Sequence, residues 1–200
     1  MIKLTNICLV RHGETEWNRI GKLQGRTDVP LNSTGIKQAE ECSMFLSDYN
    51  WDVIITSPLK RAKKTAEIIN IKLRLPFFEM EEFLERGYGD AEGMDMKERL
   101  NRFPDGIIPK NEDMHSLKQR VMEGIKNINE KFPNKKVILV AHGAVINSIL
   151  ATLSDGKIGS GKTKLINACI SNIHFNNNDW SIMDYNQVTH LSQYNEKRGF

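Results

Sequence analysis

The sequence ICLVRHGET at residues 7–15 joins four apolar residues to an arginine, a histidine and a glycine. A short apolar run of this kind predicts a buried strand of a parallel sheet, and ligands of open α/β sheets bind beyond the carboxyl ends of such strands. The arrangement recurs at residues 137–143, VILVAHG, where His142 follows the apolar run. His12 and His142 are therefore expected to meet in one crevice, with the guanidinium of Arg11 beside them.

The rest of the chain alternates between apolar runs and amphipathic stretches. In the first half we expect a loop at 21–32, a helix from about 35, a strand at 51–56, a helix from Ser57 and Pro58 to about 71, and a strand or extended arm at 77–83. In the second half we expect a short helix at 97–103, a longer one from about 111, a strand at 136–141 and a helix over 145–150. Strands at 168–175 and 180–183, joined by a polar turn, complete the pattern. Ser57 can cap the free amides of its helix, and Pro58 suits the first turn. Arg61 then lies near a helix amino end, which attracts anions. The alternation predicts an α/β fold.

The composition is that of one ordinary globular domain, which we expect to span residues 1–200. The net charge is +3 and the basic residues are interspersed with acids, which argues against nucleic-acid binding. Cys8, Cys42 and Cys169 are far apart and set among apolar neighbours, which favours buried free thiols in a reducing cytoplasm. The first apolar run is too short for a signal sequence or membrane span, so we expect a cytoplasmic protein with no membrane contact.

One stretch satisfies a nucleotide-binding pattern but stands in the wrong context. Residues 156–163, GKIGSGKT, match G-x-x-x-x-G-K-[ST]. A phosphate-binding loop of this type must leave a strand and open a helix. Here the preceding segment is predicted to be a helix and the following one a strand. We therefore interpret the stretch as a helix-to-strand connection.

Six residues have the chemistry to handle a phosphoryl group: Arg11, His12, Asn18, Arg61, Glu85 and His142. Phosphoryl oxygens need several cationic donors, which the two arginines and a second histidine supply. His12 suits the nucleophile, because adjacent cations, principally Arg11, disfavour its imidazolium form and keep a lone pair available. A protonated His142 would donate to the transferring group. A carboxyl group would protonate the leaving oxygen and later take a proton from water.

Several short motifs follow one another in order from residue 4 to about residue 150. They are RHGET at 11–15 with Trp17 and Asn18, QGRTD at 24–28, PL at 30–31, Gly35, QA at 38–39, SPLKRA at 57–62 with TA at 65–66, LE at 84–85, Gly89, EG at 92–93 and HG at 142–143. Together they resemble the histidine phosphatase superfamily. The resemblance implies a three-layer α/β/α sandwich around a mostly parallel, phosphoglycerate mutase-like sheet. It also implies a phosphohistidine at His12, a phosphate pocket of Arg11, Arg61 and His142 with help from Asn18, Glu85 as proton donor and then base, and no metal or other cofactor.

Within the superfamily, the choice is between hydrolases and mutases. The sequence LQGR at 23–26 and the short path from Glu85 to His142 resemble the small phosphatases, such as alpha-ribazole phosphatase and broad-specificity phosphatases. ERGYG at 85–89 instead is similar to the acid loop of the cofactor-dependent phosphoglycerate mutases, which are the alternative. A non-catalytic phospho-ligand binding protein is the alternative of another class, and the intact set of site residues argues against it. Ala91 stands where a bulky aromatic residue is often found, and we expect it to widen the pocket entrance.

The preferred hypothesis is a metal-independent phosphatase for a small phosphate monoester, such as a sugar phosphate, a phosphoglycerate or a ribazole-type nucleotide precursor. Its expected substrate-binding residues are Arg11, Asn18, Gln24, Gly25, Arg61, Glu85, His142 and Gly143. Residues 87–112 are expected to form a cap of loop and helix over the site. We expect a monomer or a homodimer.

Overall fold

The computed structural model describes residues 4–176 and 179–194. Its strands are β1 (Thr5–Arg11), β2 (Val53–Thr56), β3 (Phe77–Glu79), β4 (Lys136–Ala141), β5 (Ile170–Asn176) and β6 (Asp179–Gln187). Its α-helices are α1 (Glu16–Ile20), α2 (Ser33–Leu46), α3 (Lys60–Leu73), α4 (Met96–Arg102), α5 (Met114–Lys131) and α6 (Gly143–Leu153). Two 3₁₀ helices, η1 (Glu81–Phe83) and η2 (Gly89–Ala91), lie between β3 and α4.

The strands form a single sheet in the order β3-β2-β4-β1-β5-β6. β1 runs parallel to β4, with Arg11 opposite Ala141, and β2 runs parallel to β3 and β4. β5 and β6 are antiparallel to their neighbours. Because His12 and His142 directly follow the paired residues Arg11 and Ala141, the register of β1 and β4 brings both histidines to the same end of the sheet.

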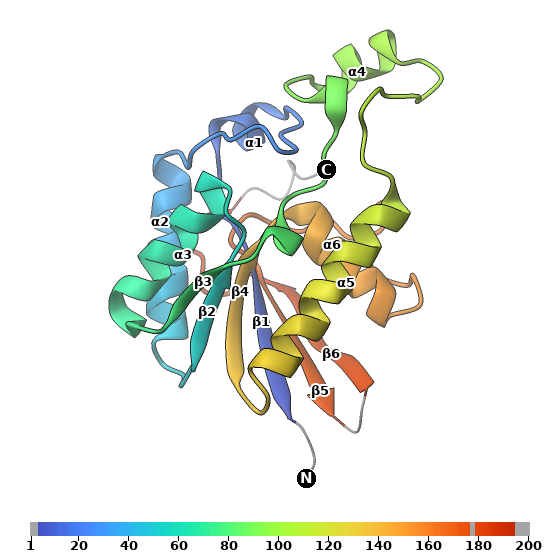
Figure 1. Cartoon of the computed structure of the whole chain (residues 1–200). Coiled ribbons are helices and arrows are strands. Elements are labelled where there is room, and N and C mark those ends of the chain that lie inside the picture. Colours follow the sequence, from blue (N-terminus) through green and yellow to red (C-terminus); the bar gives the residue numbers. More distant parts are fainter. Residues whose placement is uncertain (1–3, 177–178, 195–200) are drawn as a thin grey trace.

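Helices cover both faces of this sheet (Figure 1). α2 packs on α3, which contacts β2 and β4, and α5 packs on α6, which contacts β1 and β6. α1 and α4 lie instead beyond the carboxyl ends of the parallel strands (Figure 1). The expected three-layer α/β/α sandwich around a mostly parallel sheet is confirmed.

The core lies where the central strands meet the two helical layers. Leu9, Ile54 and Leu139 are fully buried, as expected for parallel strands covered on both faces. The apolar stripe of α5 is fully buried from Leu117 to Ile128, at spacings of three and four, whereas Met114 at its start is 44% exposed. Each large apolar side chain buried in this way contributes roughly 1.5–3 kcal/mol to folding.

Two expected helix starts are wrong by a few residues. α3 begins at Lys60, not at Ser57, and its N-cap residue, Leu59, makes no side-chain capping bond. The Ser57 hydroxyl lies 2.7 Å from Nε2 of His142 and is engaged at the carboxyl end of the sheet instead. α5 begins at Met114, because Asp113 accepts a hydrogen bond from the Ser116 amide and so caps the helix there.

Other differences concern short elements. α1 has only five residues, too few for an apolar period, and was not predicted; Thr15 and Asn18 close it with a capping box. The arm expected at 77–83 is the short strand β3 followed by η1. β6 is longer than the expected strand at 180–183. Residues 177–178 of the expected polar turn lie outside the described residues.

The GKIGSGKT stretch lies between a helix and a strand, as expected. It follows α6 and precedes β5, so the expected helix-to-strand connection is confirmed. The Lys162 ammonium donates to the carbonyl of Gly156 at 2.5 Å, within the loop itself. This lysine is therefore bonded to its own loop.

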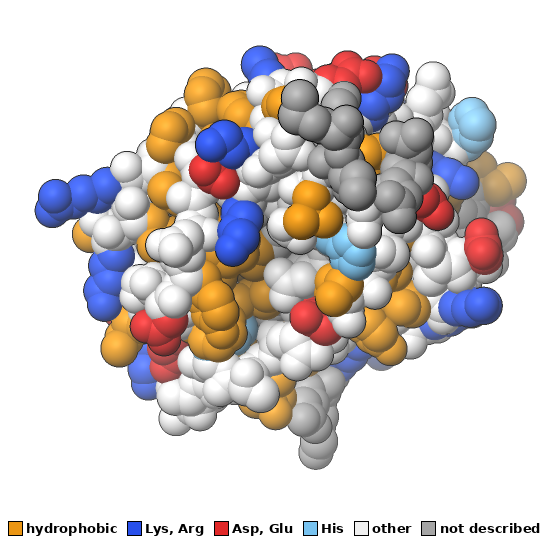
Figure 2. All heavy atoms as spheres, turned by 90° about the horizontal axis from the view of Figure 1, so that it is seen from below, with side chains coloured by type: hydrophobic (Ala, Val, Ile, Leu, Met, Phe, Trp, Pro, Cys, Tyr) orange, Lys and Arg blue, Asp and Glu red, His pale blue; other side chains and the backbone are white. Residues whose placement is uncertain are grey.

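The surface charges and the three cysteines are arranged as the composition predicts. Figure 2 shows basic and acidic side chains interspersed over the face at the amino-terminal end of the sheet. Cys8, Cys42 and Cys169 are free and buried, as expected, and burial raises the pKa of the Cys169 thiol to about 12. Among the residues that the structure describes, no helix is both long and apolar enough to cross a membrane.

Candidate active site

The two strand-end histidines meet, as the sequence predicts. The ring centroids of His12 and His142 are 5.2 Å apart, and both side chains are buried. His12 follows β1, and His142 is the N-cap residue of α6. Arg61 joins them from the first turn of α3. Two strand ends and two helix starts therefore converge on one point, where free amides and helix dipoles favour an anion.

Hydrogen bonding fixes which nitrogen of His12 is free. Nδ1 of His12 lies 2.7 Å from the carbonyl oxygen of Gly13. A carbonyl only accepts, so Nδ1 is assigned the proton and Nε2 keeps the lone pair. Burial, then the charges of Arg61 and Arg11, hold the pKa of His12 well below its usual value. The ring is thus neutral, which suits a nucleophile.

The backbone around His12 is packed too tightly to admit a side chain. A Cβ on Gly13 would lie 2.4 Å from the carbonyl oxygen of Gly35. The Gly13 amide donates to Oγ1 of Thr65 at 3.1 Å, and Nδ2 of Asn167 donates to the His12 carbonyl at 3.1 Å. These contacts explain why glycine follows His12 and fix the position of the ring.

The two buried arginines are anchored by backbone carbonyls. Nη1 of Arg61 donates to Thr27 O at 2.9 Å, and Nη2 donates to Gly25 O at 2.6 Å. Nη1 of Arg11 donates to Leu165 O. In the described part of the chain, Nε of each arginine is buried without a hydrogen-bond partner. Buried donors are normally paired, so these two N–H groups are available for the oxygens of a bound anion.

Glu92 holds the loop whose carbonyls anchor Arg61. Its Oε1 accepts from the amides of Arg26 and Tyr88, both at 3.0 Å. Its Oε2 accepts from the amide of Thr27 at 2.8 Å and from the Thr27 hydroxyl at 2.6 Å. A Cβ on Gly25, which has φ +57°, would lie 2.0 Å from Oε1 of Glu92. The carboxylate therefore fills a turn that only glycine leaves open.

The candidate proton donor, Glu85, faces the same pocket. It is 8% exposed. Its Oε1 accepts from the Arg86 amide at 2.9 Å, and its Oε2 accepts from the Ala144 amide at 3.3 Å, at the start of α6. Glu85 and His12 therefore line the same cavity.

Arg120 fixes the backbone that carries Glu85. Its Nη1 donates to the carbonyls of Glu82 at 2.8 Å and Leu84 at 2.7 Å, and its Nη2 donates to that of Glu85 at 3.2 Å. A bidentate pair with Glu112, at 2.7 and 2.9 Å, orients the guanidinium. Sequence reasoning missed Arg120, because its place in the α5 helix gives no sign of which loop it reaches.

His142 supports the pocket from behind rather than lining it. Its Nε2 lies 2.7 Å from the Ser57 hydroxyl, and within the described residues its buried Nδ1 has no partner. Burial, then the charges of Arg61, His12 and Arg11, hold the pKa of His142 well below its usual value. A bound phosphate dianion would favour the protonated form by placing negative charge beside the ring.

A cavity of about 140 Å³ opens onto this cluster. Of the predicted site residues, those that line it are Arg11, His12, Asn18, Gln24, Gly25, Arg61, Glu85 and Gly143. Residues that sequence reasoning missed also line it: Trp17, Gly21, Lys22, Leu23, Tyr88, Arg99 and Ala144. Ala91 is fully buried and is not a lining residue, so the wider entrance expected from it does not arise at that position.

Asn18 and Gln24 are oriented through their amide oxygens. Oδ1 of Asn18 accepts from the Thr15 amide at 3.2 Å and from Nδ2 of Asn167 at 3.1 Å. Oε1 of Gln24 accepts from the Thr15 hydroxyl at 2.9 Å. With the oxygens taken, both side chains are left with their NH₂ groups as donors, which is the polarity that an anion requires.

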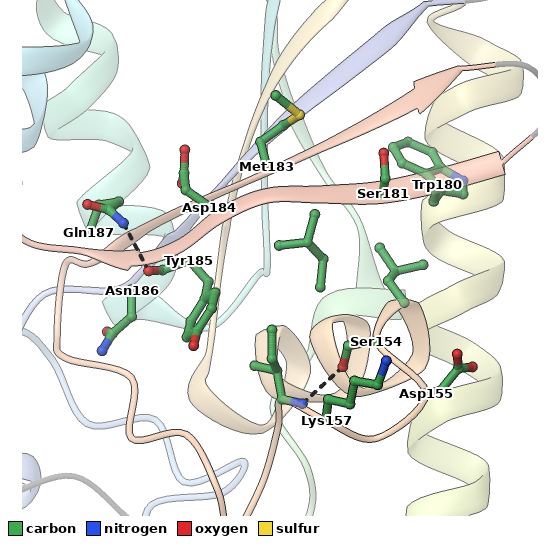
Figure 3. A pocket seen from close by; sticks show the side chains of 13 residues that line it. Ser154, Asp155, Lys157, Trp180, Ser181, Met183, Asp184, Tyr185, Asn186 and Gln187 are labelled. Carbon is green, nitrogen blue, oxygen red and sulfur yellow. Dashed lines mark hydrogen bonds between the residues drawn. The ribbon is translucent and has the colours of Figure 1, made fainter.

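A larger hollow, of about 790 Å³, lies elsewhere, between β6 and the loop after α6 (Figure 3). Figure 3 shows β6, with Trp180 and Tyr185, as one wall, and the loop with Ser154, Asp155 and Lys157 as the other. It contains neither the histidines nor the buried arginines. The smaller cavity is therefore the candidate active site, because His12, Arg11, Arg61 and Glu85 line it together.

Comparisons with known proteins identify the family of this chain. The family model of the histidine phosphatase superfamily (branch 1) matches residues 7–188, so the chain belongs to that superfamily. It is 53% identical over 191 residues to the uncharacterized phosphatase PhoE of Bacillus subtilis, covering 96% of this chain and 99% of the relative. It is 33% identical to a metal-independent phosphoserine phosphatase of Arabidopsis thaliana, covering 99% and 88%.

The fold has a close counterpart among solved structures. Bacillus stearothermophilus YhfR superposes with a TM-score of 0.87 at 25% identity, covering 93% of this chain and 98% of that one. The relatives support the expected enzyme class, a phosphatase that hydrolyses phosphoric monoesters.

Proposed function

We propose that the protein hydrolyses a small phosphate monoester through a phosphohistidine at His12, without a metal ion. The observation that carries the proposal is the contact of His12 Nδ1 with the Gly13 carbonyl, which leaves the Nε2 lone pair free on a ring that lines one cavity with Arg11, Arg61 and Glu85. A metal-independent phosphatase among the relatives supports the absence of a metal requirement.

The first step transfers the phosphoryl group to the enzyme. Nε2 of His12 attacks phosphorus, a P–N bond forms, and the bond from phosphorus to the alcohol oxygen breaks. Glu85, in its protonated form, gives its proton to the departing oxygen, so that an alcohol leaves. Arg11 and Arg61 neutralise charge on the phosphoryl oxygens, which is the main requirement of a loose transition state.

The second step returns the enzyme to its starting form. Glu85, now a carboxylate, takes a proton from water while the oxygen of that water attacks phosphorus. The P–N bond breaks, and inorganic phosphate leaves with His12 neutral again. Asn18 and Gln24, which line the cavity, hold the phosphoryl oxygens in both steps. His142 lies behind them and adds positive charge once a bound phosphate favours its protonated form.

The segment at residues 87–112 supplies Tyr88 and Arg99 to the cavity, which supports its proposed role as a cap over the site. The three buried free thiols favour a reducing compartment, the cytoplasm. We keep a monomer or a homodimer as the proposed state.

The test is turnover of p-nitrophenyl phosphate in EDTA by the wild type and by His12→Ala. The proposal expects wild-type activity in EDTA and its loss in the variant. Activity that needs added metal, or that survives the substitution, would overturn it. Stimulation by a bisphosphate, with transfer of the phosphoryl group to a second substrate molecule, would identify a mutase instead. A wild type that binds phosphate esters without turnover would identify a binding protein.

A further inference from the structure

The cavity carries more positive charge than a phosphate group uses. Its lining cations are Arg11, Lys22, Arg61 and Arg99, and its lining carboxylate is Glu85. With Glu85 protonated, as the first step of the proposed reaction requires, a bound phosphate dianion brings two negative charges against four positive ones. Two cationic charges therefore remain for a further anion on the substrate, and one would remain even with Glu85 ionised.

The two pairs of cations are held differently. Arg11 and Arg61 are buried and bonded to backbone carbonyls at the bottom of the pocket. Lys22 and Arg99 are half-buried. For neither side chain is an ion pair or hydrogen bond found among the residues that the structure describes. Half-buried cations without a protein partner are suited to bind a ligand.

Backbone hydrogen bonds bring the segments that carry Lys22 and Arg99 together. The Leu23 amide donates to Met94 O at 3.0 Å, and the Gly93 amide donates to Leu23 O at 2.7 Å. Lys22 thus lies beside the chain that leads into α4, on which Arg99 is placed.

The acids nearest to Arg99 on α4 are already used. Oε2 of Glu98 accepts from the Asp95 amide, and Oδ1 of Asp95 accepts from the Glu98 amide, both at 2.8 Å. This reciprocal capping box turns both carboxylates toward the backbone at the start of the helix. Arg99, one residue later, lines the cavity.

We propose that Lys22 and Arg99 form a subsite for a second anionic group of the substrate, a carboxylate on the leaving alcohol. The proposal rests on the proposed phosphatase function and narrows its substrate class to phosphorylated hydroxy or amino acids. The phosphoryl group binds at the bottom of the pocket, and the carboxylate pairs with the two cations at its mouth. Arginine can bind a carboxylate through two parallel hydrogen bonds, so Arg99 contributes more than Lys22.

The experiment compares substrates that differ by the carboxylate. O-phosphoserine is paired with O-phosphoethanolamine, and 3-phosphoglycerate with glycerol 3-phosphate. The quantity measured is the ratio of kcat/KM within each pair, which cancels a general effect on phosphoryl transfer. We expect the wild type to favour the carboxylate member by about tenfold or more, the scale of a hydrogen bond to a charged group. Arg99→Gln should lower the ratio about tenfold, Lys22→Gln should lower it less, and Arg99→Lys should restore part of it.

The matched control is Lys97→Gln, which removes the same charge from an exposed position on α4 that does not line the cavity. It should keep the wild-type ratio. Equal use of both members by the wild type, or an unchanged ratio in Arg99→Gln, would overturn the subsite. An equal fall of the ratio in Lys97→Gln would also overturn the subsite, because the preference would then depend only on the overall positive charge of this region.

A second measurement separates this proposal from the function on which it rests. Calorimetric binding of O-phosphoserine and O-phosphoethanolamine to His12→Ala gives the same comparison without turnover. Loss of the preference in His12→Ala/Arg99→Gln supports the subsite even if hydrolysis fails its own test. Hydrolysis that depends on His12 but shows no effect of Arg99 leaves the phosphatase standing and removes the subsite.

Discussion

The bottom of the pocket and its mouth are built in opposite ways. At the bottom, His12 and Arg61 are 2% and 1% exposed. The His12 ring contacts the carbonyl of Gly13, and Arg61 donates to two carbonyls of the loop at 25–27. At the mouth, α4 has no buried residue, and Lys22 and Arg99 are half-buried. Under the proposed function, the rigid bottom of the pocket performs the reaction, and the more exposed mouth selects the substrate.

The largest effect is expected at the bottom of the pocket. Arg61→Gln removes a guanidinium that is bonded to two carbonyls and faces the phosphoryl site. We expect kcat/KM to fall by about 10³-fold or more for every substrate, since transition-state charge loses a buried cation. Steady-state kinetics on p-nitrophenyl phosphate and O-phosphoserine measure it. If Arg61→Gln lowers kcat/KM no more than Arg99→Gln does, the bottom and the mouth of the pocket do not differ in the way proposed.

A strongly substrate-dependent effect is expected for Glu85→Gln. Alkyl phosphates need a proton on the departing oxygen, so their turnover should fall by about 10²- to 10⁴-fold. p-Nitrophenol is a good leaving group, and its release should be much less affected. The slope of log kcat/KM against leaving-group pKa measures this contrast. An equal loss for both substrate types would show that Glu85 is not the proton donor.

A smaller loss should follow from loosening the loop under Arg61. Glu92→Gln keeps the shape of the side chain but removes the charge that binds three amides and a hydroxyl. We expect kcat to fall by roughly 10- to 100-fold through misplacement of Arg61. Asp90→Asn is the matched control, since among the described residues the Asp90 carboxylate makes only a surface pair, with Lys110 at 3.7 Å. If both variants lose activity alike, the loop is not held by Glu92 in particular.

The protonation of the two histidines gives a pH-dependent prediction. Burial first, and then nearby cations, lower the pKa of both His12 and His142 in the folded protein. The unfolded chain therefore takes up these protons near pH 6.5, before the folded chain does, and the free energy of unfolding falls as the pH drops below about 6.5. NMR titration should show His12 neutral at pH 6.5 with the proton on Nδ1. A folded-state pKa at or above 6.5 would contradict the account.

The last prediction concerns the local stability of the two regions and not catalysis. α4 buries no residue, whereas α6 buries most of its middle. Amide hydrogens of α4 should exchange faster than those of α6, because opening α4 exposes little apolar surface. Hydrogen exchange read by mass spectrometry gives the two rates. Equal protection of both helices would mean that the mouth is as rigid as the bottom.

The same division separates what the sequence could predict from what it could not. Arg11 ends an apolar strand, His12 and His142 follow such strands, and Arg61 lies in the first turn of a helix. Period and register are therefore enough to predict that these residues come together. Glu85 was placed by its motif. The local pattern predicts Ser57 as a helix cap, but its hydroxyl contacts His142 instead. Local spacing cannot predict that contact, because the two residues follow different strands.

The mouth depended on contacts that no local pattern encodes. Lys22 reaches the cavity because Leu23 pairs with Met94, about seventy residues away along the chain. Arg99 reaches it because a short helix with no buried residue happens to lie over the strand ends. Arg120 supports Glu85 from the α5 helix, 35 residues further along the chain. Each of these is a loop-to-loop or loop-to-helix contact, and spacing along the sequence cannot orient such contacts.

The central claim is that His12 carries the phosphoryl group. Rapid quenching of the wild-type enzyme with substrate, followed by peptide mapping under conditions that preserve phosphohistidine, tests it most directly. The account predicts a phosphoryl group on the peptide that contains His12, attached to Nε2, and none there in His12→Asn. A phosphoryl group on His142, or turnover without any phosphorylated peptide, would contradict it.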